Sequence, residues 1–330
     1  MSAPLIKVTS PSFSSNRVLV QELAALPFRL ALNEQGCRLH GSALAEYLAD
    51  ADGAVIGLER IDAALIQACP RLKVIAKYGV GLDNVDQDAC RRRGVEVGWT
   101  PGVNRRSVAE MTVGLMIGLS RNLFATSQKL RNGLWEKNGG RQLSNLRIGL
   151  IGLGNVGQEL VRLLKPFDCP ILGNDIADRE EFCREEGVIV SAKDEIFASA
   201  DIVSLHVPLT EETRYLVNPR TLNLMKPDAF LINTSRGAVV DQEALKLSLR
   251  ANRIAGAAID VYEQEPPTDR EFLELPNLVC TPHIAGNAWE AVVAMGRSAI
   301  QHLQACFIGA SKANVIAPSE FQRMRLRRTA

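Results

Sequence analysis

Three side chains suited to proton transfer and anion binding follow separate apolar runs in the second half of the chain. Arg236 follows AFLINTS, Glu265 follows AAIDVYEQ and His283 follows LVCTP. Histidine exchanges a proton near neutral pH, and a neighbouring carboxylate stabilises its protonated form. The planar guanidinium group of arginine pairs with a carboxylate and stays charged in a partly dry site.

Together these groups suit one reaction, the interconversion of a 2-hydroxy acid and a 2-keto acid. That reaction needs a base for the hydroxyl proton, a cation for the carboxylate and an acceptor for a hydride. We expect His283 to be the acid/base, Glu265 to orient its ring and Arg236 to bind the carboxylate. Each residue also has an ordinary alternative: Arg236 as a helix cap or a partner of Asp241, Glu265 as a solvated loop carboxylate, and His283 as a hydrogen-bonded loop residue.

A glycine motif earlier in the chain, RIGLIGLGNVGQELVRLLKPF, indicates the hydride acceptor. Gly152, Gly154 and Gly157 follow an apolar run and open a helix-like stretch, where they allow a tight turn and close approach of a pyrophosphate to the helix end. Asp175 ends the next apolar run, where a carboxylate accepts hydrogen bonds from ribose hydroxyls and repels a 2′-phosphate. The pattern predicts NAD. The alternative is an ordinary glycine-rich turn in which Asp175 caps the next segment.

The elements that must position these residues alternate between apolar runs and helix-like stretches, as in parallel strands joined by helices. The apolar runs of the second half are 147–151, 171–174, 201–207, 229–233, 254–259 and 278–280. Six such runs predict a complete doubly wound sheet, with Arg236, Glu265 and His283 at the carboxyl ends of its strands.

The first part of the chain, 5–99, shows the same alternation and predicts a second parallel sheet. Residues 107–130 keep apolar positions at helical spacing without a proline, which predicts one long helix. Another helix-like stretch, 288–308, follows the last strand of the second sheet. We expect it to pack on the first domain, which makes that domain discontinuous.

Composition fits a folded protein of two domains that acts on a small molecule. The chain has 330 residues, of which 46% are hydrophobic and 23% charged, and a net charge of +1 gives no general attraction to nucleic acid or a membrane surface. Seven scattered cysteines without metal-ligand spacing, and no leader pattern or long apolar segment, predict a cytoplasmic protein with reduced thiols and no metal site. The role of one basic cluster stays open: Arg323, Arg325, Arg327 and Arg328.

Ordered motifs extend over nearly the whole chain: KYGVGLDNVD (77–86), PGVNRRSVAE (101–110), GLGNVG (152–157), HVPLTEET (206–213), INTSRGAVVD (232–241), DVYEQEP (260–266) and TPHIAG (281–286). With these motifs the sequence resembles the D-isomer-specific 2-hydroxyacid dehydrogenases, a family that includes phosphoglycerate dehydrogenase and the glyoxylate or hydroxypyruvate reductases. The resemblance implies an NAD-dependent oxidoreductase with the roles already expected for Arg236, Glu265 and His283.

The resemblance also implies further site residues. The backbone amides around Gly79, Val80 and Gly81 would hold the substrate carboxylate, and Tyr78 beside them would be a further substrate-binding residue. A larger set would line the cofactor: Thr112, Gly152, Gly154, Asn155, Val156, Gly157, Asp175, His206, Val207, Pro208, Thr213, Thr234, Ser235, Asp260 and Gly286.

The architecture that the resemblance implies is α/β, with two doubly wound parallel-sheet domains. A Rossmann NAD-binding domain (104–287) would be inserted in a discontinuous flavodoxin-like substrate-binding domain (1–103 and 288–330). The family forms two-fold dimers through the helix that corresponds to 107–130, so a homodimer is expected. Trp135 matches a position that can reach the partner's active site, and an interface aromatic is the alternative.

The substrate itself stays open. Phosphoglycerate dehydrogenases carry an arginine and small hydroxyl residues after the strand that matches 54–57, where this chain has IGLE. Glu59 is a poor neighbour for a phosphate, although Arg60 or Lys77 can compensate.

Tyr78 and Phe13 can shape a pocket for a small or partly apolar side group, or they can serve only in packing. Two rival functions also remain on the same fold. One is an NAD-sensing regulatory protein without catalysis. The other is a dehydrogenase of an unusual small anion such as phosphite or formate.

Overall fold

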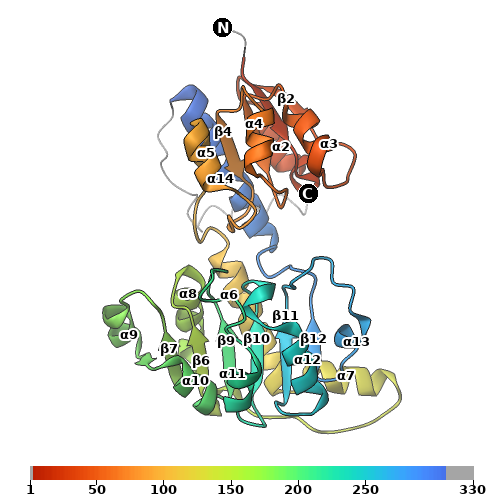
Figure 1. Ribbon diagram of the computed structural model, residues 1–330. Coiled ribbons are helices and arrows are strands. Elements are labelled where there is room, and N and C mark those ends of the chain that lie inside the picture. The colour runs from red at the N-terminus through yellow and green to blue at the C-terminus, as the bar shows by residue number, and fades with distance from the viewer. Residues whose placement is uncertain (1–2, 310–330) are drawn as a thin grey trace, which may run out of the picture. The chain divides into compact units, whose positions relative to one another are not determined.

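The computed structural model describes residues 3–309, which form two compact units. Unit 1 comprises the described residues up to Asn104 and from Asn287 onward, and unit 2 comprises Arg105–Gly286 (Figure 1). Each unit is an α/β domain around its own parallel sheet, with five strands in unit 1 and seven in unit 2. Two parallel-sheet α/β domains confirm the predicted fold class.

Unit 1 has the strand order β2-β1-β3-β4-β5. Its strands are β1 (Leu5–Val8), β2 (Arg29–Leu32), β3 (Gly53–Ile56), β4 (Val74–Lys77) and β5 (Glu96–Gly98). Its helices are α1 (Pro11–Ser14), α2 (Arg17–Ala24), α3 (Gly41–Leu48), α4 (Ala63–Ala68), α5 (Gln87–Arg93) and α14 (Trp289–Ile308). Strands β3 and β4 are buried along their whole length because helices cover both faces of the sheet.

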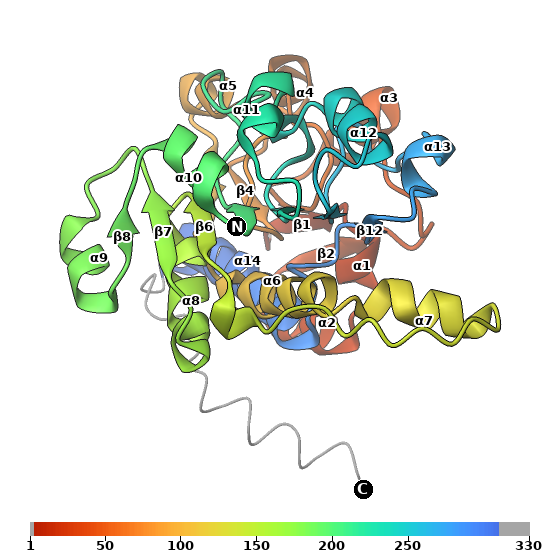
Figure 2. The same cartoon turned by 90° about the horizontal axis from the view of Figure 1, so that it is seen from below.

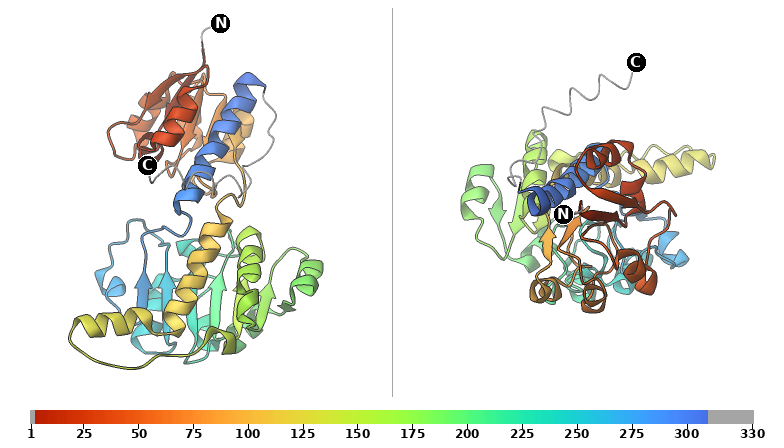
Figure 3. Two further views of the ribbon diagram at one scale, coloured as in Figure 1. Left: turned by 180° about the vertical axis from the view of Figure 1, so that it is seen from behind. Right: turned by 90° about the horizontal axis from the view of Figure 1, so that it is seen from above.

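Helix α14 packs on unit 1, where it shares one face of the sheet with α2. Val293 of α14 and Leu19 of α2 belong to the same buried cluster, and Arg297 pairs with Glu22 at 2.6 Å. The close approach depends on Gly296, because a Cβ there would lie 2.2 Å from a methyl of Leu19. The view from behind shows this blue helix across the sheet, and residues of α3, α4 and α5 form the core on the other face (Figure 3).

Unit 2 has the strand order β12-β11-β10-β9-β6-β7-β8. The strands are β6 (Ile148–Ile151), β7 (Ile171–Asn174), β8 (Ile189–Val190), β9 (Ile202–Leu205), β10 (Phe230–Asn233), β11 (Gly256–Ile259) and β12 (Leu278–Cys280). The helices are α6 (Arg105–Ser120), α7 (Leu123–Arg131), α8 (Asn155–Leu164), α9 (Glu180–Glu186), α10 (Lys193–Ser199), α11 (Pro219–Leu224), α12 (Gln242–Arg250) and α13 (Arg270–Leu273). Helices α6 and α8 pack on one face and α10, α11 and α12 on the other, because residues along each strand alternate between two cores.

Two elements of unit 2 differ from the expectation. The single helix predicted over 107–130 is wrong: α6 and α7 are separate because Asn122 takes a left-handed conformation with φ of 52°, which asparagine tolerates better than most residues. The ring of Phe124 then lies against Gly118, where a Cβ would be 2.2 Å from it. A seventh strand, β8, was not predicted, because its two residues are exposed and too few to form a pattern.

Large apolar side chains are exposed on α7 and the segment after it: Leu123, Phe124, Leu130, Leu134 and Trp135. Figure 2 shows α7 extending away from the sheet of unit 2. Within residues 3–309, no helix is long and apolar enough to cross a membrane. The arginine cluster at 323–328 lies outside the described residues.

Candidate active site

The strand order of unit 2 reverses between β6 and β9, and ligands of such sheets bind at the carboxyl ends of the strands near this point. Gly152 follows β6 and Asp175 follows β7. Arg236, Glu265 and His283 come after β10, β11 and β12. The sheet therefore brings the expected cofactor and catalytic residues of unit 2 to one edge.

His283 and Glu265 form a direct pair. Nδ1 of the imidazole lies 2.7 Å from Oε2 of the carboxylate, and the two side chains are 39% and 30% exposed. Because an ionised carboxylate only accepts hydrogen bonds, Nδ1 carries the proton and Nε2 is the ring nitrogen that is turned away from Glu265. Burial alone would raise the pKa of Glu265, but hydrogen bonds from His283 and from the Tyr262 amide, with the nearby charge of Arg236, hold that pKa below its usual value.

The buried carboxylate of Asp260 holds the backbone around His283. It accepts hydrogen bonds from the Thr281 hydroxyl at 2.6 Å and from the amides of Ile284 and Ala285 at 2.9 and 2.8 Å. The His283 amide donates to the Asp260 carbonyl at 2.8 Å. These bonds stabilise His283 at φ of 54°, which is uncommon for a residue other than glycine. Asp260 thus positions the backbone that carries the His283 imidazole.

Tyr262 connects the two halves of the pair. Its amide donates to Oε1 of Glu265 at 3.1 Å, and its hydroxyl donates to the Thr281 carbonyl at 3.0 Å. Burial raises the pKa of Tyr262 well above its usual value, so the hydroxyl stays a neutral donor. Tyr262, in the segment after β11, therefore supports both the Glu265 carboxylate and the loop that carries His283.

Arg236 is presented by a polar turn after β10. Asn233 accepts from the Ser235 amide at 3.0 Å, and its own amide group donates to the Arg236 carbonyl at 2.9 Å. Gly237 must follow, because a Cβ there would lie 1.9 Å from the Tyr262 carbonyl carbon. Asp241, the alternative partner of Arg236, caps α12 by accepting a hydrogen bond from the Ala244 amide at 3.0 Å.

The glycine turn has the properties of an anion-binding turn. Gly152 has φ of 99° and lies against the His206 carbonyl, and a Cβ on Gly157 would lie 2.1 Å from the Gly152 carbonyl oxygen. By contrast, nothing lies within 4 Å of the place where Gly154 would carry a Cβ. No side chain caps α8, which begins with Asn155 and Val156, so its first amides suit a pyrophosphate.

Asp175 lies beside the glycine turn in a surface hollow of about 370 Å³. Its Oδ2 accepts from the Leu153 amide at 2.6 Å and its Oδ1 from the Ala177 amide at 2.8 Å. Each oxygen keeps a second lone pair for a ribose hydroxyl. Exposed Ile176 and Val190 line the same hollow and offer apolar surface to a base. These residues fit the adenosine part of a dinucleotide.

His206 is not a second candidate for proton transfer. Its Nε2 lies 2.9 Å from the Ser204 hydroxyl, and desolvation lowers the pKa of His206 to about 4, which keeps the ring neutral near pH 7. The loop after it, with Val207 and Pro208, is closed by the hydroxyl of Thr213, which donates to the Pro208 carbonyl at 2.6 Å.

The remaining cofactor candidates lie on α6 and in the loops after β10 and β12. Thr112 is fully buried, donates to the Val108 carbonyl at 2.8 Å and lies 3.3 Å from the Thr234 hydroxyl. Ser235 belongs to the turn that presents Arg236, and Gly286 follows the segment bound by Asp260. The structure brings Thr112 and Thr234 together.

The expected substrate loop of unit 1 follows β4. Gly79 has φ of 148°, and the Val80 carbonyl accepts a hydrogen bond from the Trp99 indole at 2.6 Å. Tyr78 is buried and packs edge to face with fully buried Phe13, with ring centroids 5.2 Å apart. Phe13 is therefore a core residue.

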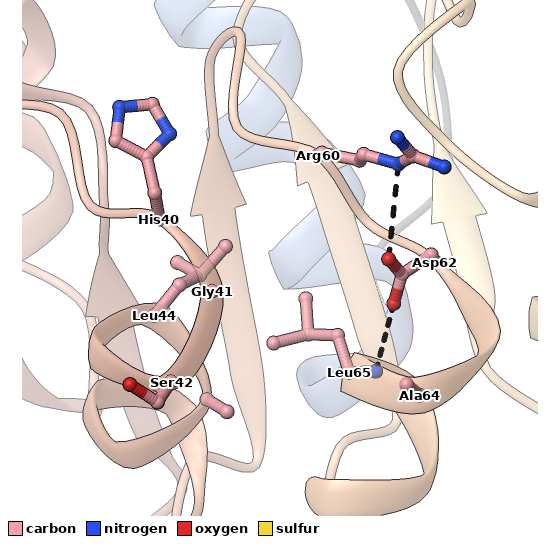
Figure 4. A pocket seen from close by; sticks show the side chains of 9 residues that line it. His40, Gly41, Ser42, Leu44, Arg60, Asp62, Ala64 and Leu65 are labelled. Carbon is pink, nitrogen blue, oxygen red and sulfur yellow. Dashed lines mark hydrogen bonds and ion pairs between the residues drawn. The ribbon is translucent and has the colours of Figure 1, made fainter.

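A further hollow of about 450 Å³ lies at the N-terminal ends of α3 and α4, between His40 and Arg60 (Figure 4). The Arg60 side chain is one of those that line this hollow; it is 85% exposed, and its Nε lies 3.7 Å from Asp62 Oδ2. Among the described residues, no group of His, Cys, Asp and Glu is placed to hold a metal ion.

Sequence reasoning missed Asn233 and Tyr262 as supporting residues. Asparagine followed by threonine and serine at a strand end is a turn signal that points to the first. Nothing local indicates the second, because its hydroxyl bonds to a carbonyl 19 residues later.

Comparison with known proteins gives matches over both units. Residues 113–285 match the family model for the D-isomer specific 2-hydroxyacid dehydrogenase, NAD binding domain. A glyoxylate reductase of Thermofilum pendens is 42% identical over 262 residues, which cover 76% of each chain. A hydroxypyruvate reductase of Thermotoga maritima is 38% identical over 249 residues, 74% of this chain and 80% of the relative. The structure of Aquifex aeolicus D-lactate dehydrogenase complexed with NAD and lactic acid covers 92% of this chain and 96% of its own, with a TM-score of 0.81 and 26% identity.

Proposed function

Because the chain belongs to the D-isomer-specific 2-hydroxyacid dehydrogenase family, we propose that it transfers a hydride between NAD(H) and a small D-2-hydroxy acid or its 2-keto partner. The observation that carries this proposal is the His283–Glu265 pair, with Nδ1 and Oε2 2.7 Å apart and Arg236 close enough to lower the pKa of Glu265.

His283 moves the proton. In the neutral ring Nδ1 donates to Glu265, so Nε2 accepts the hydroxyl proton when the acid is oxidised and returns it when the keto acid is reduced. Ionised Glu265 stabilises the imidazolium that forms, and its lowered pKa keeps it charged in mildly acidic solution. The bound nicotinamide supplies the acceptor or donor of the hydride.

Arg236 binds the substrate carboxylate through its planar guanidinium group. The amides of Gly79, Val80 and Gly81 in the unit 1 loop give further hydrogen bonds to a substrate carboxylate, whereas the Tyr78 amide already donates to the Ile56 carbonyl at 2.8 Å. Orientation by several fixed donors supplies rate because the reacting atoms lose no further freedom in the transition state.

The cofactor is NAD rather than NADP. The uncapped start of α8 receives the pyrophosphate, and the Asp175 carboxylate accepts from the ribose hydroxyls but repels a 2′-phosphate. The support for this choice is the hollow in which Asp175 lies beside the glycine turn.

The test is turnover of NADH with glyoxylate, hydroxypyruvate and 2-ketobutyrate, followed by NADH absorbance, with NADPH in parallel. His283→Ala is expected to lower kcat by about 10²–10⁴-fold, since that is the usual share of a positioned acid/base. NADH binding, measured by fluorescence, is expected to be unchanged. The control is His40→Ala, which alters an exposed histidine of unit 1. Full activity of His283→Ala would overturn the assignment.

We also propose that the protein is a homodimer. The exposed apolar side chains on and after α7, among them Phe124 at 46% and Trp135 at 76%, form the kind of surface that a partner covers. A cytoplasmic location stays a prediction from the cysteine pattern.

A further inference from the structure

The sheet of unit 1 also has a point where the strand order reverses, between β1 and β3. Ligands of doubly wound sheets bind beside the carboxyl ends of the strands at such a point. Ser10, Gly57 and Lys77 lie at the ends of β1, β3 and β4. The Tyr78 amide donates to the Ile56 carbonyl at 2.8 Å, so the expected carboxylate loop begins directly beside the loop after β3.

Glu59 gives this place a buried negative charge. Its residue is 1% exposed, and Oε2 accepts from the Gly57 amide at 2.6 Å. A Cβ on Gly57 would lie 3.5 Å from the same oxygen and 3.3 Å from the Ser10 hydroxyl. The carboxylate therefore already uses the first backbone donor after β3, which an external anion would otherwise need.

Lys77 belongs to the same buried place and donates hydrogen bonds to neutral groups there. Its residue is 3% exposed, and Nζ donates to the Gly57 carbonyl at 2.5 Å and to Asn84 Oδ1 at 2.7 Å. The Asn84 side-chain amide in turn donates to the Glu59 carbonyl at 2.5 Å. The lysine, the asparagine and both loops thus form one buried network, which keeps the glutamate in place.

Besides the Asn84 amide, the uncharged polar groups described here include hydroxyls. Ser10 Oγ lies 3.1 Å from Ser12 Oγ, and the buried ring of Tyr78 packs against Phe13 beside them. Hydroxyls donate to or accept from a neutral polar group, whereas they do not neutralise a dianion.

Resting on the proposed function, we propose that Glu59 makes unit 1 select substrates with a small, uncharged side group, such as hydrogen or hydroxymethyl, and reject phosphorylated ones. A phosphate beside β3 would meet a buried carboxylate that already uses the Gly57 donor. Opposed like charges in a partly dry site disfavour binding.

The test compares kcat/KM for hydroxypyruvate and 3-phosphohydroxypyruvate with NADH, with glyoxylate as the smallest substrate. The wild-type protein is expected to favour hydroxypyruvate over the phosphorylated acid by about a hundredfold, because opposed like charges are costly in a binding site. Glu59→Gln keeps an oxygen for the Gly57 amide but removes the charge. It is expected to shift the ratio toward the phosphorylated acid by about tenfold. Glu46→Gln, which alters an exposed carboxylate on α3, is the matched control and should leave the ratio unchanged.

Leu58→Arg is the second variant, since Leu58 is 52% exposed in the same loop and its replacement leaves the buried network intact. Leu58→Arg should also shift the ratio of kcat/KM values toward the phosphorylated acid. The inference is overturned if the wild-type protein prefers the phosphorylated acid, or if neither folded variant changes the ratio. Either result leaves the proposed function standing, whereas no turnover on any of these keto acids, with NADH still bound, contradicts the proposed function itself.

Discussion

The two units both have parallel, doubly wound sheets, yet the charged side chains at the strand ends are partly exposed in unit 2 and buried in unit 1. In unit 2, His283 and Glu265 keep 39% and 30% of their side chains exposed, and their bond leaves Nε2 directed away from the pair. In unit 1, Glu59 and Lys77 are almost fully buried and bonded to backbone groups. Groups that exchange protons must reach a ligand, whereas groups that only shape a site can be internal. The same topology thus supports a reacting pair in one unit and a structural network in the other.

The largest expected effect tests the reacting pair. Glu265→Gln removes the charge that stabilises the imidazolium, so kcat should fall by about a hundredfold, within the range for general acid–base groups. The free energy of unfolding should change by less than about 1 kcal/mol, because the side chain is partly exposed. Steady-state kinetics and urea unfolding measure the two quantities. Glu263→Gln, two residues away and exposed, is the control, and an equal loss of kcat in that variant would contradict a specific role for Glu265.

The opposite response is expected in unit 1. Lys77→Met removes the Lys77 donor to the Asn84 side-chain oxygen and the shorter of two donors to the Gly57 carbonyl, which should lower the free energy of unfolding by about 2–4 kcal/mol. Urea unfolding measures the loss. Lys73→Met, at an exposed position of the same unit, should be neutral to within about 0.5 kcal/mol. If both lysine variants unfold alike, the buried network does not stabilise unit 1.

A smaller effect is expected at Asp201, a buried carboxylate of unit 2 outside the reacting pair. The test asks whether its hydrogen bonds stabilise the folded protein, as the buried network does in unit 1. Asp201 accepts from the Arg147 amide at 2.7 Å and from Lys226 at 3.1 Å. Burial would raise the pKa of Asp201, but these bonds lower it below its usual value. A carboxyl whose pKa is lower in the folded protein stabilises it above the unfolded pKa of about 3.9, and this contribution is lost as the pH falls through the folded value.

Asp201→Asn should therefore destabilise the protein by about 1–2 kcal/mol at neutral pH, and the difference from wild type should shrink below about pH 4. Thermal unfolding across pH measures it. Asp228→Asn is the control, since Asp228 shares Arg141 as a partner but its side chain is 65% exposed. A pH-independent difference for Asp201→Asn would show that packing, not charge, explains the loss.

The parts of the site that sequence alone could predict are those with local causes. Gly152, Gly154 and Gly157 follow one another within a single turn, and Asp175 ends the next strand, so spacing suffices to find them. The break at Asn122 was missed because the apolar spacing continues through it, while the reversal depends on one backbone angle and on Phe124 folding onto Gly118.

By itself, the sequence determined the alternation of strands and helices apart from β8 and the break between α6 and α7, the glycine turn, and the kinds of residue available for proton transfer, because periodicity and turn chemistry act over a few positions. The sequence also led us to expect Glu265 beside His283, but only the tertiary structure decided the geometry of that pair and the other contacts between distant groups. His283 and Glu265 are 18 residues apart, Lys77 and Gly57 are 20 apart, and Asp260 and Ala285 are 25 apart. Burial also lowers the pKa of His206 and encloses Glu59. Such environments depend on how the sheets pack the chain, and no local pattern of residues encodes them.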